Sequence, residues 1–430
     1  MKIIDTGSDG LSSFLQALEV NRRSSLLTSA RIAASVIDEV RESGDEAVAE
    51  FVSKFDGVPC AADDLATVPS LPAIGADIRN SIELAMANIR RAHERQVSTG
   101  YSIENDGIRI RHRVAPLTRV GIYVPGGSAA YISTLMMCAI PARLAGVKEI
   151  VVASTPMATD LPEFQYVCSR LGVTEIYRAG GPAAIAAMAI GTRSLPRVDK
   201  IVGPGSGLVT AAKRLLYGEV GLDMTAGPSE IVILADDSAN PAWVAADLLA
   251  QAEHGADSVA VCVTTSRNLA REIDSQVREQ LAGFSGDKSS APQSIANNGA
   301  ILIASDLDAA VAVVNRIAPE HVEIMTADAE RIADRVLDCG AIFCGSHSAV
   351  AIGDYAAGTN HVLPTAGSAR FFSPLGVYDF VKRTSIVTVS EPGFAGVAEA
   401  VERLAELEGL PLHARSVALR RSGVPSGVVS

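Results

Sequence analysis

The sequence lacks paired cysteines, and this absence excludes a disulfide-stapled extracellular protein. No C-x-x-C pair occurs among the 430 residues. The cysteines are scattered, which indicates reduced thiols in a reducing cytoplasm, mostly packed in the core. They are Cys60, Cys138, Cys168, Cys262, Cys339 and Cys344.

The chain also lacks a long apolar run and a signal peptide. Its first residues have no charged region followed by an apolar stretch. The most apolar region, 129–140, is too short to span a bilayer and is followed by Pro141 and Arg143. We therefore expect a soluble, cytoplasmic protein without a membrane partner.

The sequence has fewer positively than negatively charged residues. With 37 Lys and Arg against 49 Asp and Glu, the formal net charge is -12. This argues against nucleic acid and anionic membrane surfaces as partners. It does not exclude an anionic cofactor held by local N–H groups.

Aromatic residues are few, at 4%, while 48% of the residues are hydrophobic. A composition rich in Ala, Val, Ile and Gly is typical of α/β proteins with packed parallel strands. A length of 430 residues predicts two or three domains.

The usual nucleotide fingerprints, G-x-G-x-x-G and the P-loop, are absent. Short apolar runs nevertheless end repeatedly in glycines or small polar residues, and helical sequence follows each. This rhythm predicts doubly wound sheets with ligands beyond the carboxyl ends of the strands. The expected strands start near Val120, Ile150, Glu175, Lys200, Ile231, Val259, Ala300 and Ala341, and the first ends in Gly126-Gly127-Ser128.

The stretch 240–255 predicts a helix whose last turn carries two potential metal-binding side chains. Asn240 can cap it, Pro241 suits its first position, and Gly255 can end it in the left-handed conformation. Gln251 and His254 are three apart and share a face in the last turn. The pair is either a polar helix end in solvent or half of a metal site.

Two later segments carry acids beside histidines. Glu320 and His321 are adjacent, and adjacent side chains on an extended segment point opposite ways. We interpret them as an exposed pair unless the segment lies at the rim of a pocket. The segment 353–365 is denser in Gly, Asp, Asn and His than a connection needs. Asp354 is a candidate oxygen ligand and His361 a candidate acid–base or anion-binding residue.

Two other histidines have ordinary explanations. His93 follows Arg90 and Arg91 near the end of a predicted helix and is interpreted as solvated. His112 belongs to an alternating strand with one basic face and is expected on that face.

Several co-linear motifs together resemble the histidinol dehydrogenase family, from about Ala30 to Arg420. The motifs are Asp223-Met-Thr-Ala-Gly-Pro-Ser229-Glu230, Gln251-Ala-Glu-His254, Pro319-Glu320-His321, Gly353-Asp354-Tyr-Ala-Ala-Gly-Thr-Asn-His361-Val-Leu-Pro-Thr, Ser373-Pro-Leu-Gly-Val-Tyr-Asp-Phe-Val-Lys-Arg383 and His413.

The resemblance implies a zinc enzyme that oxidises a primary alcohol through an aldehyde to a carboxylate with two molecules of NAD. The alcohol it implies is L-histidinol, and the product L-histidine. It places one zinc per subunit on Gln251, His254, Asp354 and His413. It also implies a homodimer with shared active sites, in which His413 comes from the partner subunit.

The resemblance also implies roles for the remaining motif residues. His321 would take the hydroxyl proton, and Glu320 would activate water on the aldehyde. Ser229, His361 and Glu408 match substrate-contacting positions, as do His321 and the metal ligands Gln251, His254, Asp354 and His413. The charge of Glu408 would pair with a cationic part of histidinol.

The cofactor contacts depart from the family pattern. Tyr123 is retained, but Ala183 stands where the family usually has Gln, and Ser206 where it usually has Asn. Ser206 can still donate a hydrogen bond, whereas Ala183 cannot. Losing one polar contact weakens binding by about 1 kcal/mol. Cofactor binding is then weaker, rearranged or directed at another nucleotide.

The resemblance implies two doubly wound, incomplete Rossmann-like α/β domains with a small C-terminal helical tail. The expected layout is an N-terminal arm, a discontinuous catalytic and metal-binding domain, an NAD-binding domain and a tail that reaches the partner subunit. The ranges are 1–25, 26–122 with 231–375, 123–230 and 376–430, respectively.

Two alternatives remain open. A paralogue could oxidise another small polar alcohol, for example a sulfonated propanediol. An anionic alcohol of this kind would require an added positive side chain in the pocket, such as Arg370 or Arg383. A non-catalytic, metal-dependent ligand-binding protein would explain altered cofactor contacts but not the retained pair of Glu320 and His321.

Overall fold

A computed structural model describes residues 1–126, 131–224, 227–284 and 289–423, with only the backbone at 23–28. The chain divides into a larger unit, Met1–Val97 with Leu117–Phe380, and a smaller one, Ser98–Pro116 with Val381–Ser430. No helix in the described ranges has the length and apolarity to cross a membrane. The turn residues Gly127 and Ser128 lie outside these ranges, as do Thr225 and Ala226.

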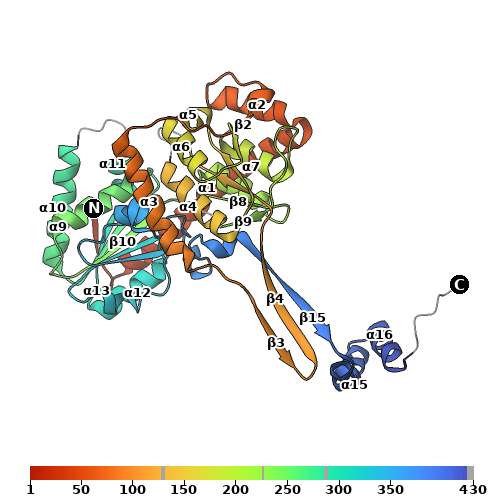
Figure 1. The fold of residues 1–430 in the computed structure, drawn as a ribbon. Coiled ribbons are helices and arrows are strands. Elements are labelled where there is room, and N and C mark those ends of the chain that lie inside the picture. The colour runs from red at the N-terminus through yellow and green to blue at the C-terminus, as the bar shows by residue number, and fades with distance from the viewer. Residues whose placement is uncertain (127–130, 225–226, 285–288, 424–430) are drawn as a thin grey trace. The chain divides into compact units, whose positions relative to one another are not determined.

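The first sheet of the larger unit has six parallel strands (Figure 1). In spatial order they are β1 (Lys2–Asp5), β12 (Ala300–Ile303), β11 (Val259–Thr264), β10 (Glu230–Ala235), β13 (His321–Met325) and β14 (Ala341–Cys344). The four central strands are buried along their whole length, as expected of a parallel sheet covered on both faces. Strand order reverses between β10 and β13, which makes this the switch point of the sheet.

The second sheet repeats the pattern. Its spatial order is β2 (Ala66–Thr67), β7 (Glu175–Tyr177), β6 (Glu149–Ala153), β5 (Arg119–Tyr123), β8 (Lys200–Val202) and β9 (Gly221–Leu222). All neighbours are parallel except β2 with β7. Here the strand order reverses between β5 and β8. Two doubly wound sheets confirm the predicted fold class.

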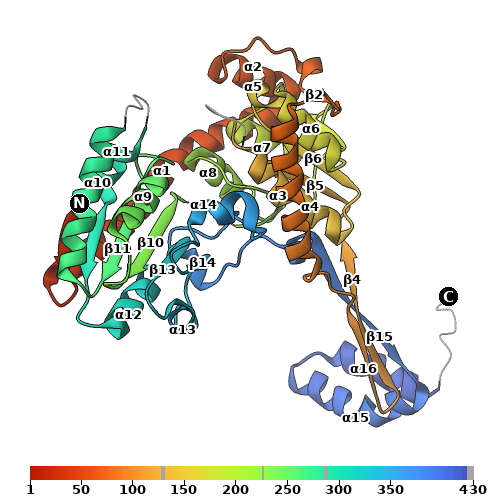
Figure 2. The same ribbon diagram turned by 60° about the vertical axis from the view of Figure 1, so that its left-hand side comes forward.

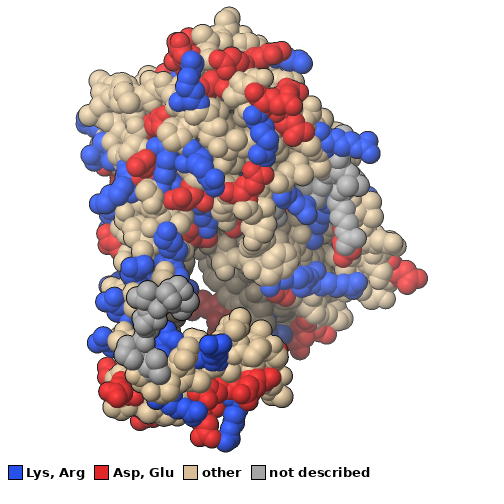
Figure 3. Space-filling view, turned by 90° about the vertical axis from the view of Figure 1, so that its right-hand side faces the viewer, with Lys and Arg blue, Asp and Glu red and all other residues tan. Residues whose placement is uncertain are grey.

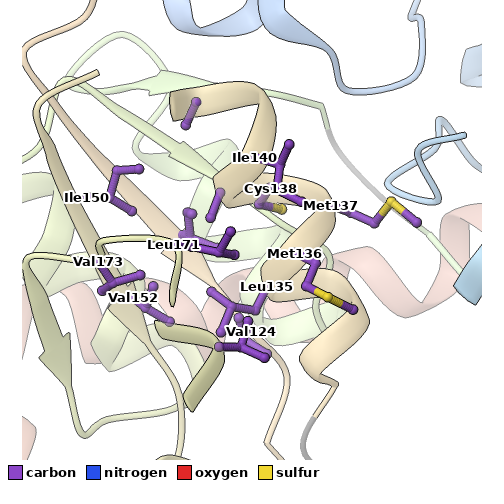
Figure 4. Packing of buried hydrophobic residues seen from close by; sticks show 14 of the residues in the cluster. Val124, Leu135, Met136, Met137, Cys138, Ile140, Ile150, Val152, Leu171 and Val173 are labelled. Carbon is purple, nitrogen blue, oxygen red and sulfur yellow. The ribbon is translucent and has the colours of Figure 1, made fainter. Parts of the chain in front are cut away.

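Helices cover both faces of each sheet (Figure 2). On the first sheet they are α9 (Pro241–Ala252), α10 (Arg267–Gly283), α11 (Ala291–Asn298), α12 (Leu307–Ile317) and α13 (Ala329–Ala333). On the second they are α2 (Asp45–Phe55), α3 (Ala76–Glu94), α4 (Ile132–Ala145), α6 (Pro162–Arg170), α7 (Gly181–Ile190) and α8 (Gly207–Leu215), and the short α5 (Pro156–Thr159) precedes α6. Figure 4 shows Leu135 and Ile140 of α4 among side chains of β6, including Val152.

The long helix α1 (Asp9–Ser43) belongs to both sheets. Near its start, Leu11 and Leu15 join the hydrophobic cluster of the first sheet. Near its end, Val36 and Val40 join that of the second. Figure 2 shows this helix running from one sheet to the other. One helix therefore ties the two halves of the larger unit together.

The predicted division of the chain is wrong at its beginning. Residues 1–25 are no arm, since β1 pairs with β12 and α1 packs in the core. The sequence predicts that residues 26–122 belong with 231–375, yet Val36 and Ile89 pack on the second sheet. The reason is that periodicity identifies the apolar face of a helix but not the sheet that this face covers.

The smaller unit is a three-stranded antiparallel sheet followed by two helices. Its strands lie in the order β15 (Val381–Val389), β4 (Ile108–Pro116) and β3 (Tyr101–Asn105), and its helices are α15 (Glu391–Leu407) and α16 (Pro411–Arg421). Strand β4 alternates as predicted, but His112 is half-buried on the face opposite the arginines. Its Nε2 pairs with Ser385 Oγ at 3.2 Å. The expectation that His112 lies on the basic face is wrong.

Charges of both signs are interspersed over the face shown in Figure 3. The excess of negative charge is therefore not gathered into one patch on that face.

Candidate active site

A pocket of about 720 Å³ lies in the larger unit and is lined by loops from both sheets. From the second sheet, Pro125 and Gly203 follow the carboxyl ends of β5 and β8. From the first sheet, Ser229 and His321 stand at the amino ends of β10 and β13. The predicted placement at carboxyl ends holds for one sheet and is wrong for the other. Both edges lie where the strand order reverses, and diverging connections leave a crevice at the carboxyl edge.

The end of α9 brings Gln251 to the interior and His254 to the pocket wall. Asn240 caps the helix as predicted, because its side chain accepts a hydrogen bond from the amide of Ala242. The helix ends at Ala252 rather than at Gly255, and Gly255 has no positive φ. Gln251 is buried, and its Nε2 is buried without a partner among the described residues. Desolvation in the pocket lowers the pKa of His254.

Glu320 and His321 are buried beside each other, 7% and 4% exposed. Glu320 Oε2 lies 3.5 Å from His321 Nδ1. Burial raises the pKa of Glu320 well above its usual range and lowers that of His321 to about 3. The interpretation as an exposed pair is wrong, because β13 is an interior strand and the pair sits where it enters the sheet.

Asp354 and His361 complete this wall of the pocket. Asp354 lies in a π-helical turn, Gly353–Ala357, that follows the short helix α14 (Val350–Ile352). Such turns are frequent at functional sites. Its Oδ1 is 3.8 Å from His321 Nε2, and burial raises its pKa to about 6. His361 Nδ1 donates to the carbonyl of Asp354, so its Nε2 accepts from the Thr134 hydroxyl. Burial lowers the pKa of His361 to about 4.

The candidate metal ligands of the larger unit are of the chemical types that a catalytic zinc binds. His254 and Asp354 offer an imidazole and a carboxylate to one pocket, and the unpartnered amide of Gln251 lies one turn before His254. No group of three His, Cys, Asp or Glu is placed to hold a metal within the described ranges. The other predicted ligand, His413, is an exposed residue of α16 in the smaller unit, as is Glu408 at the end of α15.

Of the residues predicted to contact the cofactor, Ser206 lines the pocket, whereas Tyr123 and Ala183 lie together in one hydrophobic cluster. Ser206 stands ahead of α8 and lines the pocket. Gly203 beside it must be glycine, because φ is +112° and a Cβ would lie 2.1 Å from the Tyr123 carbonyl oxygen. Tyr123 is buried, and its hydroxyl accepts from the amide of Gly181. Ala183 is fully buried in the hydrophobic cluster on that face of the second sheet. Tyr123 and Ala183 are not among the residues that line the described pocket.

Sequence reasoning missed three polar residues of the site, and it misjudged the burial of one histidine outside the site. Arg22 and Thr134 line the pocket, and buried Glu230 contacts both Glu320 and His321 through its main chain. A charged residue opening an otherwise apolar strand was the available signal for Glu230. His93, expected in solvent, is buried and bonds to the Ile89 carbonyl through Nδ1.

Neutral burial of His361 predicts a pH-dependent stability. Its folded pKa of about 4 is below its ordinary 6.5, so the unfolded chain binds a proton that the folded chain does not. The contribution is present above pH 6.5 and is lost as pH falls. Between pH 7.5 and 5, metal-free wild type should lose about 2 kcal/mol more unfolding free energy than His361→Gln. Urea unfolding in a chelator at both pH values measures this. Equal losses in the two proteins would refute neutral burial.

The comparisons with known proteins agree on one family. The family model described as histidinol dehydrogenase matches residues 21–421. A histidinol dehydrogenase of Aquifex aeolicus is 43% identical over 393 residues, covering 90% of this chain and 91% of that protein. One of Listeria monocytogenes is 40% identical over 433 residues, covering 98% and 99%. The crystal structure of histidinol dehydrogenase from Elizabethkingia anophelis superposes with a TM-score of 0.84 at 34% identity, covering 91% and 92%.

Proposed function

This chain belongs to the histidinol dehydrogenase family of NAD-dependent oxidoreductases, and on that premise we propose that it oxidises L-histidinol through the aldehyde to L-histidine. The observation that carries the proposal is the buried pair of Glu320 and His321 at the pocket. Neutral His321 carries a basic nitrogen, Nε2, that is buried without a hydrogen-bond partner among the described residues. A base and a second acid–base group at one site suit two successive oxidations.

The residues of the pocket divide the chemistry between them. His321 Nε2 accepts the hydroxyl proton as the carbon loses hydride. Glu320 then takes a proton from water as the water adds to the aldehyde carbon, and the second hydride loss gives the acid. One hydride would pass to NAD in each oxidation.

Gln251, His254, Asp354 and His413 would hold the metal. Zinc, when bound, orients the amino alcohol and polarises its oxygen. Ser229 and His361 line the same pocket and would contact the substrate, and Glu408 would pair with its cationic part.

A second substrate class is favoured by a specific observation. Arg214, Arg316 and Arg370 line the pocket, in addition to Arg22, whose charge is paired with that of Glu230. The guanidinium of Arg370 donates to the Arg316 carbonyl and pairs with Asp338 at 3.3 Å. Cations in the lining would suit an anionic alcohol such as a sulfonated propanediol. A non-catalytic binding protein does not account for the buried Glu320 and His321.

Steady-state assays test the function directly. Zinc-loaded protein with NAD should reduce two NAD per histidinol, and histidinol should give the highest kcat/KM in a panel that includes anionic alcohols. A higher kcat/KM for an anionic alcohol would select the paralogue. No reduction with any alcohol, despite bound zinc, would reject both enzyme proposals. The cytoplasm is the proposed compartment, in keeping with six free cysteines.

We propose a homodimer whose partner supplies His413, and complementation between inactive chains tests it. One chain carries His413→Ala and the other His321→Ala, each with its own tag. A purified heterodimer then has one complete site of two, so about half of the wild-type activity should return. Each homodimer should remain inactive. A heterodimer as inactive as its parents would contradict the exchange of His413 between subunits.

A further inference from the structure

Arg22 of α1 and Glu230 of β10 form a buried two-point ion pair. Nε and Nη2 of Arg22 each donate to one carboxylate oxygen at 2.8 Å. The side chains are 12% and 1% exposed, respectively. Two parallel charge-assisted bonds fix the direction of the carboxylate as well as its distance. Glu230 therefore has little freedom at the start of its strand.

The main chain of Glu230 holds both residues to which the chemistry is assigned. Its amide donates to Glu320 Oε2 at 3.0 Å, and its carbonyl is 3.1 Å from His321 Nδ1. A carbonyl only accepts, so Nδ1 of neutral His321 must carry the ring proton. Nε2 is thereby left unprotonated. Glu230 thus orients Glu320 and selects the His321 tautomer whose unprotonated Nε2 can accept a proton in the pocket.

Arg22 also holds the segment that leads into this pair. Its Nη1 and Nη2 both lie 3.3 Å from the carbonyl oxygen of Ile317, the last residue of α12. The chain then turns through Ala318, which is in the left-handed conformation with φ 50°. The guanidinium therefore connects the start of β10 to the approach to β13.

We propose that Arg22 is a positioning residue for the reaction, which it serves by anchoring Glu230 so that the Glu230 peptide groups orient Glu320 and His321. This inference rests on the proposed function for its kinetic consequence. Arg22 acts through Glu230, although it also lines the pocket, because its donors are already engaged by Glu230 and Ile317.

Kinetics of Arg22→Met with the alcohol and with the aldehyde test this role. Since misplacing reacting groups by about 1 Å can cost about 100-fold in rate, we expect kcat to fall by about 10- to 100-fold for both substrates. KM should stay within about threefold because the pocket itself is retained. Arg22→Lys keeps the positive charge but not the two-point guanidinium geometry, so its kcat should lie between those of wild type and Arg22→Met. Unchanged kcat, or an increase in KM alone, would overturn the proposal.

Two further variants separate positioning from stability. Arg22→Met leaves Glu230 buried without its cation, so the double variant Arg22→Met with Glu230→Gln removes the charge imbalance. The double variant should regain melting temperature but not kcat; recovery of kcat would show that charge balance alone matters. Arg41→Met is the matched control. Arg41 belongs to the same helix as Arg22, and its substitution removes an exposed ion pair with Glu219. This variant should leave kcat unchanged.

The ring tautomer gives a readout that does not require turnover. In protein with ¹⁵N-labelled histidine, the His321 signal, assigned by its loss in His321→Gln, should show the Nδ1–H form in wild type. It should show a mixture of both tautomers in Arg22→Met. An unchanged Nδ1–H form in the variant would refute the positioning role even if the protein oxidised no alcohol. Inactivity of wild type with the predicted tautomer change would instead reject only the proposed function.

Discussion

Replacing His321 by glutamine is expected to slow alcohol oxidation by about 10²- to 10⁴-fold, the usual contribution of a positioned general base. The buried imidazole is neutral because its pKa lies near 3, and Nε2 is its only nitrogen without a partner in the described structure. Glutamine keeps most of the volume and can still donate to the Glu230 carbonyl, but it offers no base. Substrate KM should change far less than kcat.

The matched control for this substitution is His93→Gln. His93 is as buried as His321 and also bonds through Nδ1 to a backbone carbonyl, but it does not line the pocket. Its replacement should leave kcat within about threefold, since the hydrogen-bond partners of His93, Ile89 and Asn360, do not line the pocket. Steady-state rates at saturating NAD, with melting temperatures of both variants, decide the matter. A fully active His321→Gln enzyme would remove the base from the proposed mechanism.

Replacing His254 by alanine is expected to abolish stoichiometric zinc. His254 is one of two candidate ligands that line the pocket, and the other is Asp354. Altering even an outer partner of a metal ligand costs about 10- to 100-fold in affinity, so loss of a ligand itself should cost more. Metal content after dialysis, and the zinc-dependent rise in melting temperature, measure the loss.

His347→Ala is the control for the zinc experiment. His347 is an exposed histidine that packs near Trp243 and lies outside the pocket lining. Zinc content of this variant should equal that of wild type. If His254→Ala also retained one zinc per chain, His254 would not be a ligand.

Local sequence determined the elements of this fold because their signals are local. Alternating or continuous apolar runs predicted β5 to β8, β10 to β12 and β14, and Asn240 with Pro241 predicted the start of α9. The site residues could be named from co-linear motifs, and His254, Asp354, Glu320, His321 and His361 do line one pocket. The predicted strands did not include β13, because Pro319, Glu320 and His321 at its entrance resemble a loop.

What only tertiary structure decided are the contacts between distant segments. His93 carries ordinary helix-end neighbours in sequence, yet Asn360, which is remote in the chain, meets its ring in the core. The pocket uses the amino edge of one sheet and the carboxyl edge of the other, a choice that no strand pattern encodes. In the sequence, Arg22 cannot be distinguished from other positively charged residues of an amphipathic helix. Its pairing with Glu230 exists because α1 crosses both sheets, and burial of two charges is tolerated only where the fold brings them together.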